Sequence, residues 1–109
     1  MYSVDKTGYK QTLLDFHQQV ENSYQVFKDS NIQLDASKIS SIVYFGMGGS
    51  GIVGDLLTDV LFDDLQVPIS VVRSYMAPGF CNSNTLIIVS SYSGNTEETL
   101  EAYTQAKSL

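Results

Sequence analysis

The stretch Ser41-Ile42-Val43-Tyr44-Phe45, followed by Gly46-Met47-Gly48-Gly49-Ser50-Gly51, decides the fold of this chain. Residues 42–45 are apolar, β-branched or aromatic, which indicates a short buried strand that ends at Gly46. A helix is predicted after Gly51, and its inward-facing stripe would consist of Ile52, Val53, Leu56, Leu57, Val60 and Leu61. A strand, a glycine-rich turn and a helix in succession are typical of an α/β protein.

Two further strands and a helix follow in the sequence. Residues 68–72 and 85–90 are short apolar runs, and residues 75–84 between them have loop composition. The last helix is predicted from about Glu97, and its inner face would consist of Leu100, Tyr103 and Ala106. Together these elements predict a three-layer, doubly wound parallel sheet with a flavodoxin-like strand order. Because the third strand would be an apolar edge, we expect this sheet to be incomplete and the chain to be the N-terminal piece of a longer protein.

A second loop of small residues, Ser91-Tyr92-Ser93-Gly94-Asn95-Thr96, occupies the same place between a strand and a helix as the first. Helix N-termini expose unpaired N–H groups and carry a partial positive charge. In a flavodoxin-like order, strands one and three are neighbours, so both loops face one crevice. The sequence therefore predicts an anion site for a phosphate ester, in which the hydroxyls of Ser50, Ser91, Ser93 and Thr96 are the candidate side-chain donors. Asn95 and Glu98 have the spacing of a capping box at the start of the last helix.

The region before the first strand has a different character. Residues 11–28 carry an apolar stripe at three- and four-residue steps, which predicts an amphipathic helix, and residues 29–38 are a polar connection. His17 lies on this helix and is interpreted as a surface histidine. We therefore divide the chain into an N-terminal helical segment, 1–38, and an α/β domain, 39–109.

Composition excludes several classes of function. The chain has 109 residues, with 6 Lys and Arg against 12 Asp and Glu and a net charge of −6, so a broad nucleic-acid surface is not expected. No apolar run approaches the ~20 residues of a membrane span, and no basic and apolar leader begins the chain. Cys81 is the single cysteine and cannot form an internal disulfide or a zinc cluster. These features predict a cytoplasmic protein without a metal, a nucleic-acid partner or a membrane partner.

Other motif interpretations stay open. Gly46, Gly48 and Gly51 also match a dinucleotide-binding fingerprint, and Arg73 at the end of the second strand would suit the 2′-phosphate of NADP. A P-loop is less consistent, because Ile52 stands where that motif needs lysine. A sensor that binds a sugar phosphate without catalysis is a third class.

The two loop strings, Gly46 to Asp55 and Ser91 to Thr99, resemble those of the sugar isomerase (SIS) domain. Within that superfamily the chain most resembles the phosphoglucose/phosphomannose isomerases. The resemblance implies a five-stranded parallel sheet, a homodimer and no cofactor. It also implies binding of the 6-phosphate of a hexose phosphate by Gly49, Ser50, Ser91, Ser93 and Thr96.

The same resemblance implies a reaction. Members of this group move a proton between C1 and C2 through a cis-enediol, with glucose 6-phosphate as substrate and mannose 6-phosphate as a further candidate. The catalytic glutamate, histidine and lysine of the family lie outside the matched stretch, so no catalytic residue is assigned in this chain. We therefore expect the chain alone to be inactive.

Overall fold

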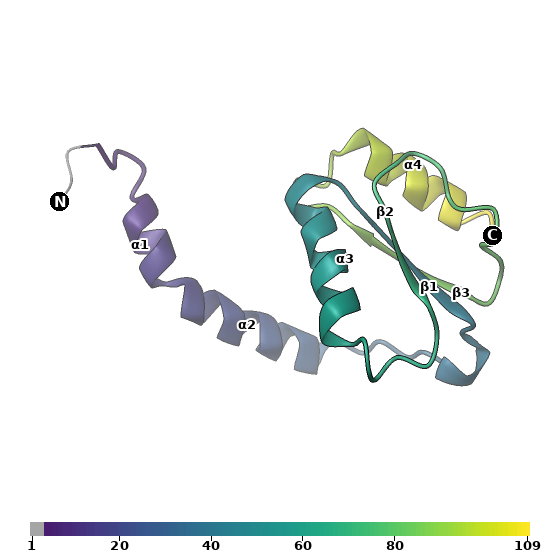
Figure 1. Cartoon of the computed structure of the whole chain (residues 1–109). Helices are drawn as coiled ribbons and strands as arrows, with labels where there is room; N and C mark the ends of the chain where they lie inside the picture. The colour runs from purple at the N-terminus through teal and green to yellow at the C-terminus, as the bar shows by residue number, and fades with distance from the viewer. Residues whose placement is uncertain (1–3) are drawn as a thin grey trace. The chain divides into compact units, whose positions relative to one another are not determined.

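The computed structural model describes residues 4–109. The chain divides into two units, and the boundary lies between Leu34 and Asp35. The first unit contains helices α1 (Tyr9–Leu14) and α2 (Phe16–Asp29) (Figure 1). The Asp5 carboxylate accepts hydrogen bonds from the backbone N–H groups of Tyr9 and Lys10, at 2.8 and 3.0 Å. These bonds satisfy two donors at the start of α1 and hold the pKa of Asp5 below its usual value.

The single helix predicted over residues 11–28 is therefore two helices. Asp15 separates them with φ −88° and ψ 4°, and the backbone bonds from Asp15 N to Gln11 O and from Gln18 N to Asp15 O continue on both sides. Aspartate is common at such a break because its side chain can compete with the helix backbone for hydrogen bonds. Here the Asp15 carboxylate accepts a hydrogen bond from the side-chain amide of Gln11 at 2.9 Å. The predicted apolar stripe is exposed along both helices, which bury no residue.

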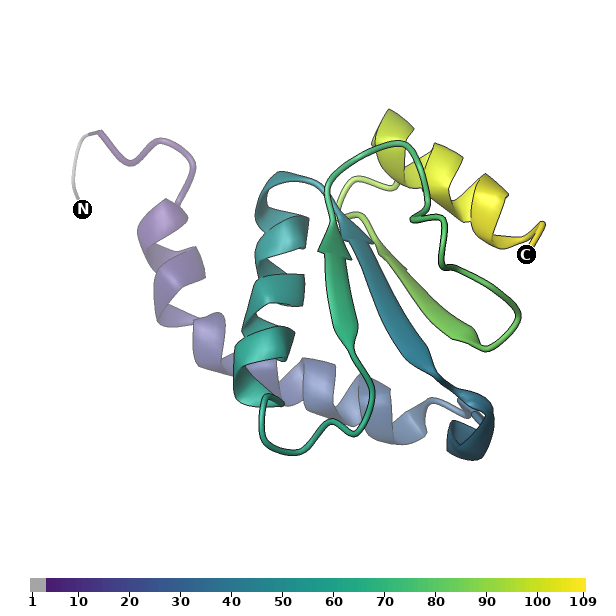
Figure 2. The same ribbon diagram turned by 45° about the vertical axis from the view of Figure 1, so that its right-hand side comes forward.

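The second unit is a three-stranded parallel sheet with a helix on each face (Figure 2). Its elements are a 3₁₀ turn (Ala36–Lys38), β1 (Ser41–Gly46), α3 (Gly48–Val60), β2 (Ile69–Val72), β3 (Thr85–Ser90) and α4 (Glu97–Ala106). The strand order is β2-β1-β3, so β1 is the central strand and β3 pairs with it from Ser41↔Thr85 to Gly46↔Ser90. The predicted α/β class and the adjacency of strands one and three are confirmed.

The central strand is buried on both sides, as expected for a parallel sheet. Val43 and Phe45 point to one face, where they pack with Ala102 of α4. Tyr44 points to the other face, toward α3. At Gly54 of α3, a Cβ atom would lie only 2.6 Å from Cδ1 of Tyr44, so the absence of a side chain lets the helix approach the sheet closely.

The predicted inner faces of both helices are wrong in most of their residues. In α3 Gly51 and Gly54 are buried and the predicted Leu57 and Leu61 are half-buried, whereas Ile52, Val53, Leu56 and Val60 are exposed. In α4 Thr99 and Ala102 are buried and the predicted Ala106 is half-buried, whereas Leu100 and Tyr103 are exposed. The physical reason is the same in both helices: small residues face the sheet because they permit a short helix-to-sheet distance, and hydropathy alone does not register this.

The connection from β2 to β3 crosses the sheet without a helix. Ala77 and Cys81 of this connection pack against the buried core residues, and burial raises the pKa of the Cys81 thiol. Gln105 of α4 holds the connection, because its side-chain oxygen accepts from Ala77 N and its nitrogen donates to Tyr75 O, both at 3.0 Å. Among residues 4–109, no helix combines the length and apolarity needed to cross a bilayer.

Candidate functional site

The first strand-to-helix junction is built from backbone. Only Met47 separates Gly46, the end of β1, from Gly48, which begins α3 with a φ of 51°. Most of the predicted glycine loop is therefore the first turn of the helix. A Cβ atom at Gly51 would lie 2.6 Å from the carbonyl oxygen of Gly46, so strand end and helix turn touch directly. This close approach seats the first turn of α3 against the end of β1.

The second junction is built from hydroxyl side chains. Thr96 Oγ1 lies 3.0 Å from Ser91 Oγ and 3.4 Å from Ser93 Oγ. The Gly94 N–H donates to Ser91 Oγ at 3.0 Å, and the Asn95 N–H donates to Ser93 Oγ at 3.2 Å. The three hydroxyls thus form one cluster in front of α4.

The start of α4 differs from the predicted capping box. Thr96, not Asn95, is the residue that precedes the helix, and its side chain makes no capping hydrogen bond. Asn95 is displaced from this role because its backbone is held in the turn by Ser93. Among residues 4–109, no side chain caps the start of α3 either. The first N–H groups of both helices therefore donate no hydrogen bond to a capping side chain.

Both junctions open into one cleft of about 630 Å³ at the carboxyl edge of the sheet. All five residues predicted to bind phosphate line the cleft: Gly49, Ser50, Ser91, Ser93 and Thr96. The other lining residues are Met47, Val53, Ser90 and Tyr92. The pairing of Gly46 with Ser90 brings the two strand ends together and so creates this convergence. The hypothesis that two separate loops face one crevice is confirmed.

The cleft has features that the sequence did not identify. Met47 and Val53 give it an apolar side, and Tyr92 stands fully exposed at its edge. The place of Tyr92 between two serines in the loop was the available signal. An exposed aromatic ring beside hydroxyl donors is a common arrangement for a ligand with both apolar and polar faces.

The electrostatics of the cleft depend on dipoles rather than on formal charge. Among residues 4–109, those that line it include no carboxylate, imidazole or amine. Two helix N-termini and the hydroxyls of Ser50, Ser91, Ser93 and Thr96 are instead the groups available to an anion. Such neutral donors can hold an anion, whereas they supply no group that would exchange a proton with a sugar carbon near neutral pH.

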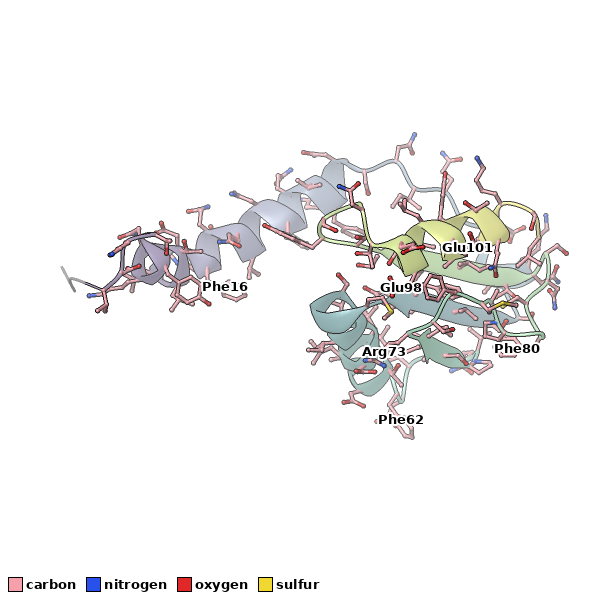
Figure 3. The ribbon with its side chains drawn as sticks, turned by 90° about the horizontal axis from the view of Figure 1, so that it is seen from above. Phe16, Phe62, Arg73, Phe80, Glu98 and Glu101 are labelled. Carbon is pink, nitrogen blue, oxygen red and sulfur yellow. The ribbon has the colours of Figure 1, made fainter. Side chains whose placement is uncertain are left out.

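Charged groups lie next to the cleft without lining it. Glu97 and Glu98 occupy the first turn of α4, as the sequence predicted, where they interact favourably with the helix dipole. Partial burial and the charges of Glu97 and Glu98 together raise the pKa of Tyr75. Arg73, which follows β2, pairs with Asp55 of α3 (Figure 3).

His17 is an exposed helix residue in the first unit, and its Nδ1 lies 3.0 Å from the carbonyl oxygen of Leu14. In residues 4–109, no three histidine, cysteine, aspartate or glutamate side chains group together in a way that could hold a metal ion.

Comparison with known proteins adds relatives. The chain is 40% identical over 97 residues to a bifunctional phosphoglucose/phosphomannose isomerase of Caldicellulosiruptor bescii, covering 89% of this chain and 29% of that protein. It is 40% identical over 88 residues to a protein of the same name from Aquifex aeolicus, covering 80% of this chain and 28% of that protein. A D-glucosamine-6-phosphate 4-epimerase of Sulfolobus acidocaldarius is 44% identical over 68 residues, covering 62% of this chain and 21% of that protein.

The chain thus spans less than a third of the length of these relatives. No family model matches the sequence, and no solved structure matches the fold. The relatives confirm the resemblance that the two loops predicted. Over most of its length, the chain is similar to part of the bifunctional phosphoglucose/phosphomannose isomerases.

Proposed function

We propose that this chain is the sugar-phosphate-binding part of an aldose–ketose isomerase that acts on glucose 6-phosphate, with mannose 6-phosphate as a second substrate. The observation that carries the proposal is the convergence of Gly49, Ser50, Ser91, Ser93 and Thr96 on one cleft between two helix N-termini. In this proposal, the N–H groups at the start of α3 and the hydroxyls before α4 bind the 6-phosphate. Residues 39–109 then belong to the SIS domain, and residues 1–38 are its N-terminal helical segment.

The names of the relatives favour a role in phosphate binding over a role in proton transfer. Two of the relatives are named for isomerisation of phosphorylated glucose and mannose, and one is named for 4-epimerisation of D-glucosamine 6-phosphate. These names differ in the reaction and agree in a phosphorylated hexose. A segment similar to all of them is therefore best assigned to the phosphate that their substrates share.

The composition of the cleft supports the same division of labour. Isomerisation through a cis-enediol needs a base that removes a proton from carbon, and the lining residues within the described part of the chain offer none. In our proposal, the proton-transfer groups come from outside these 109 residues, and the chain alone binds the sugar phosphate without converting it. A homodimer and a cytoplasmic location remain predictions, of which sedimentation tests the first.

An amide NMR titration of the chain tests the proposal. Separate samples are titrated with glucose 6-phosphate, mannose 6-phosphate, inorganic phosphate and NADP. We expect shifts at Gly48–Gly51 and 91–96 with both sugar phosphates and with phosphate, and dissociation constants roughly between micromolar and millimolar. Incubation of the chain with glucose 6-phosphate should yield no fructose 6-phosphate.

Two results would contradict the proposal. Shifts with NADP that include Arg73, without shifts from the sugar phosphates, would favour the dinucleotide interpretation. Sugar-phosphate shifts outside both junctions would place the binding elsewhere on the chain.

A further inference from the structure

Arg73 lies against the first turn of α3, next to the first junction. It follows the last residue of β2, and its Nε lies only 2.7 Å from the place where a Cβ of Gly51 would stand. Its guanidinium also pairs with the Asp55 carboxylate, one turn further along α3. Figure 3 labels Arg73 beside this helix. The side chain therefore joins the end of β2 to two successive turns of α3.

Gly51 and Asp55 contribute to the Arg73 contact in different ways. Gly51 is buried and has no side chain, which leaves room for the guanidinium against the helix backbone. Asp55 is half-exposed and draws the guanidinium onto the helix by charge. Gly49 and Ser50, directly before Gly51, line the cleft, whereas Arg73 does not. Arg73 thus touches the donor-bearing turn without lining the cleft.

We propose that Arg73 is a positioning residue: with Asp55, it holds the first turn of α3 so that the backbone N–H of Gly49 and the hydroxyl of Ser50 face the cleft. The inference rests on the proposed function of that cleft in binding phosphate. Its physical basis is preorganisation, because donors that are already fixed lose less conformational entropy when an anion binds. A guanidinium suits the role because it is planar, always charged and able to lie flat on backbone.

A direct attraction between Arg73 and the phosphate is the competing explanation, and it predicts the opposite response at Asp55. If charge alone mattered, neutralising Asp55 would remove a negative group and release the Arg73 charge, so phosphate would bind more tightly. If positioning matters, the same change releases the guanidinium from the helix, so phosphate binds less tightly. The sign of the effect separates the two explanations.

The experiment uses the full chain and inorganic phosphate, with binding followed by the amide signals of Gly49 and Ser50. For Asp55→Asn and for Arg73→Lys we expect phosphate binding to weaken between about threefold and tenfold. Asp59→Asn is the matched control, since Asp59 is an exposed carboxylate on α3 that forms no ion pair within residues 4–109. This control removes the same charge and should leave phosphate binding unchanged or slightly tighter.

Amide hydrogen exchange without ligand gives an independent readout. The N–H groups of Ser50 and Gly51 both donate to the Met47 carbonyl oxygen, at 3.0 and 3.3 Å. Asp55→Asn should speed exchange at Ser50 and Gly51 while leaving residues 91–96 unchanged. Phosphate binding as tight as or tighter than in the parent chain, or unchanged exchange at Ser50 and Gly51, would overturn the inference. If the parent chain bound no phosphate, the proposed function would fail, and faster exchange in Asp55→Asn would still establish the positioning contact. Because the ion pair is partly exposed, both variants should remain folded, which their amide spectra check.

Discussion

The two strand-to-helix junctions face the same cleft, yet they are built in different ways. After β1, a single residue leads into α3, and glycine lets the strand end and the helix turn touch. After β3, six residues, 91–96, lead into α4, and three of their hydroxyls form a hydrogen-bonded cluster. The first junction therefore presents backbone donors and the Ser50 hydroxyl on a helix turn packed against the strand end, and the second presents side-chain donors that hydrogen-bond to one another.

This difference determines how each junction responds to substitution. A backbone N–H cannot be removed by changing a side chain, so at the first junction only the Ser50 hydroxyl can be removed in that way, and the backbone donors are altered only by displacing the helix turn. A hydroxyl can be removed singly, so the contribution of the second junction can be divided among its residues.

The largest effect is expected for Gly51→Ala. The new methyl would lie 2.6 Å from the Gly46 carbonyl oxygen, a backbone atom that cannot move without shifting the strand or the helix. We expect a loss of about 1–3 kcal/mol of unfolding free energy, the usual cost of overpacking, together with loss of phosphate binding. Thermal unfolding followed by circular dichroism and a phosphate titration measure the two effects.

Gly49→Ala is the matched control for stability. It lies two residues away in the same turn, has no positive φ and has no atom within 4 Å of an added Cβ. Because alanine is a better helix former than glycine, its stability should be unchanged or higher by up to about 1 kcal/mol. Equal stability losses in both variants would show that close contact at Gly51 does not control this junction.

Removal of single hydroxyls at the second junction should act on binding rather than on stability. Thr96→Val keeps the shape of the side chain and removes the hydroxyl that lies near both Ser91 and Ser93. Since a hydrogen bond to a charged group contributes about 1.5–3 kcal/mol, we expect affinity for glucose 6-phosphate to fall roughly tenfold or more. Ser93→Ala should have a similar or smaller effect, measured in the same titration.

Ser83→Ala is the control for these variants. Ser83 is exposed near the opposite end of β3, where its hydroxyl donates to the Asn84 side chain. Its loss should leave sugar-phosphate affinity unchanged. Unchanged affinity in both Thr96→Val and Ser93→Ala would remove the hydroxyl cluster from the binding model.

The strands and both junctions could be predicted from sequence because their signals are local. Residues 42–45 and 85–90 are apolar runs with polar or glycine boundaries, and the glycine and serine strings follow at fixed places. The helix faces could not be predicted in this way. Hydropathy favoured Ile52 and Leu56 for the inner face of α3, whereas Gly51 and Gly54 face the sheet. The prediction failed because the limited space between α3 and Tyr44 is a tertiary contact, which the local sequence does not show.

The role of Arg73 was beyond sequence reasoning for a related reason. At the end of the second strand, its position suggested an NADP phosphate, and only the fold shows Asp55 and Gly51 beside it. Such pairings join residues 18 or more positions apart, and the sequence carries no spacing rule for them. By contrast, Ser91, Ser93 and Thr96 lie within six residues, so their clustering could be predicted.

The smallest effect concerns charge, which differs between the junctions because only α4 has acidic residues in its first turn. Partial burial and the carboxylates of Glu97 and Glu98 raise the pKa of Tyr75 above its usual value of 10.0. Glu98→Gln should lower that pKa, since it removes one of the two charges that oppose the phenolate. Ultraviolet titration of tyrosinate absorbance measures the change, with Glu101→Gln, on the same helix, as the control.

The raised pKa also fixes the sign of a pH effect on stability. The folded chain holds the Tyr75 proton more tightly than the unfolded chain, so this contribution is complete below about pH 10 and is lost as the pH rises through the folded pKa. We therefore expect Glu98→Gln to flatten the decline in stability above pH 10, and Glu101→Gln to leave that decline as it is. An identical decline in the parent chain and Glu98→Gln would show that the carboxylate beside the second junction does not act on Tyr75, and that the two junctions differ in their donors alone.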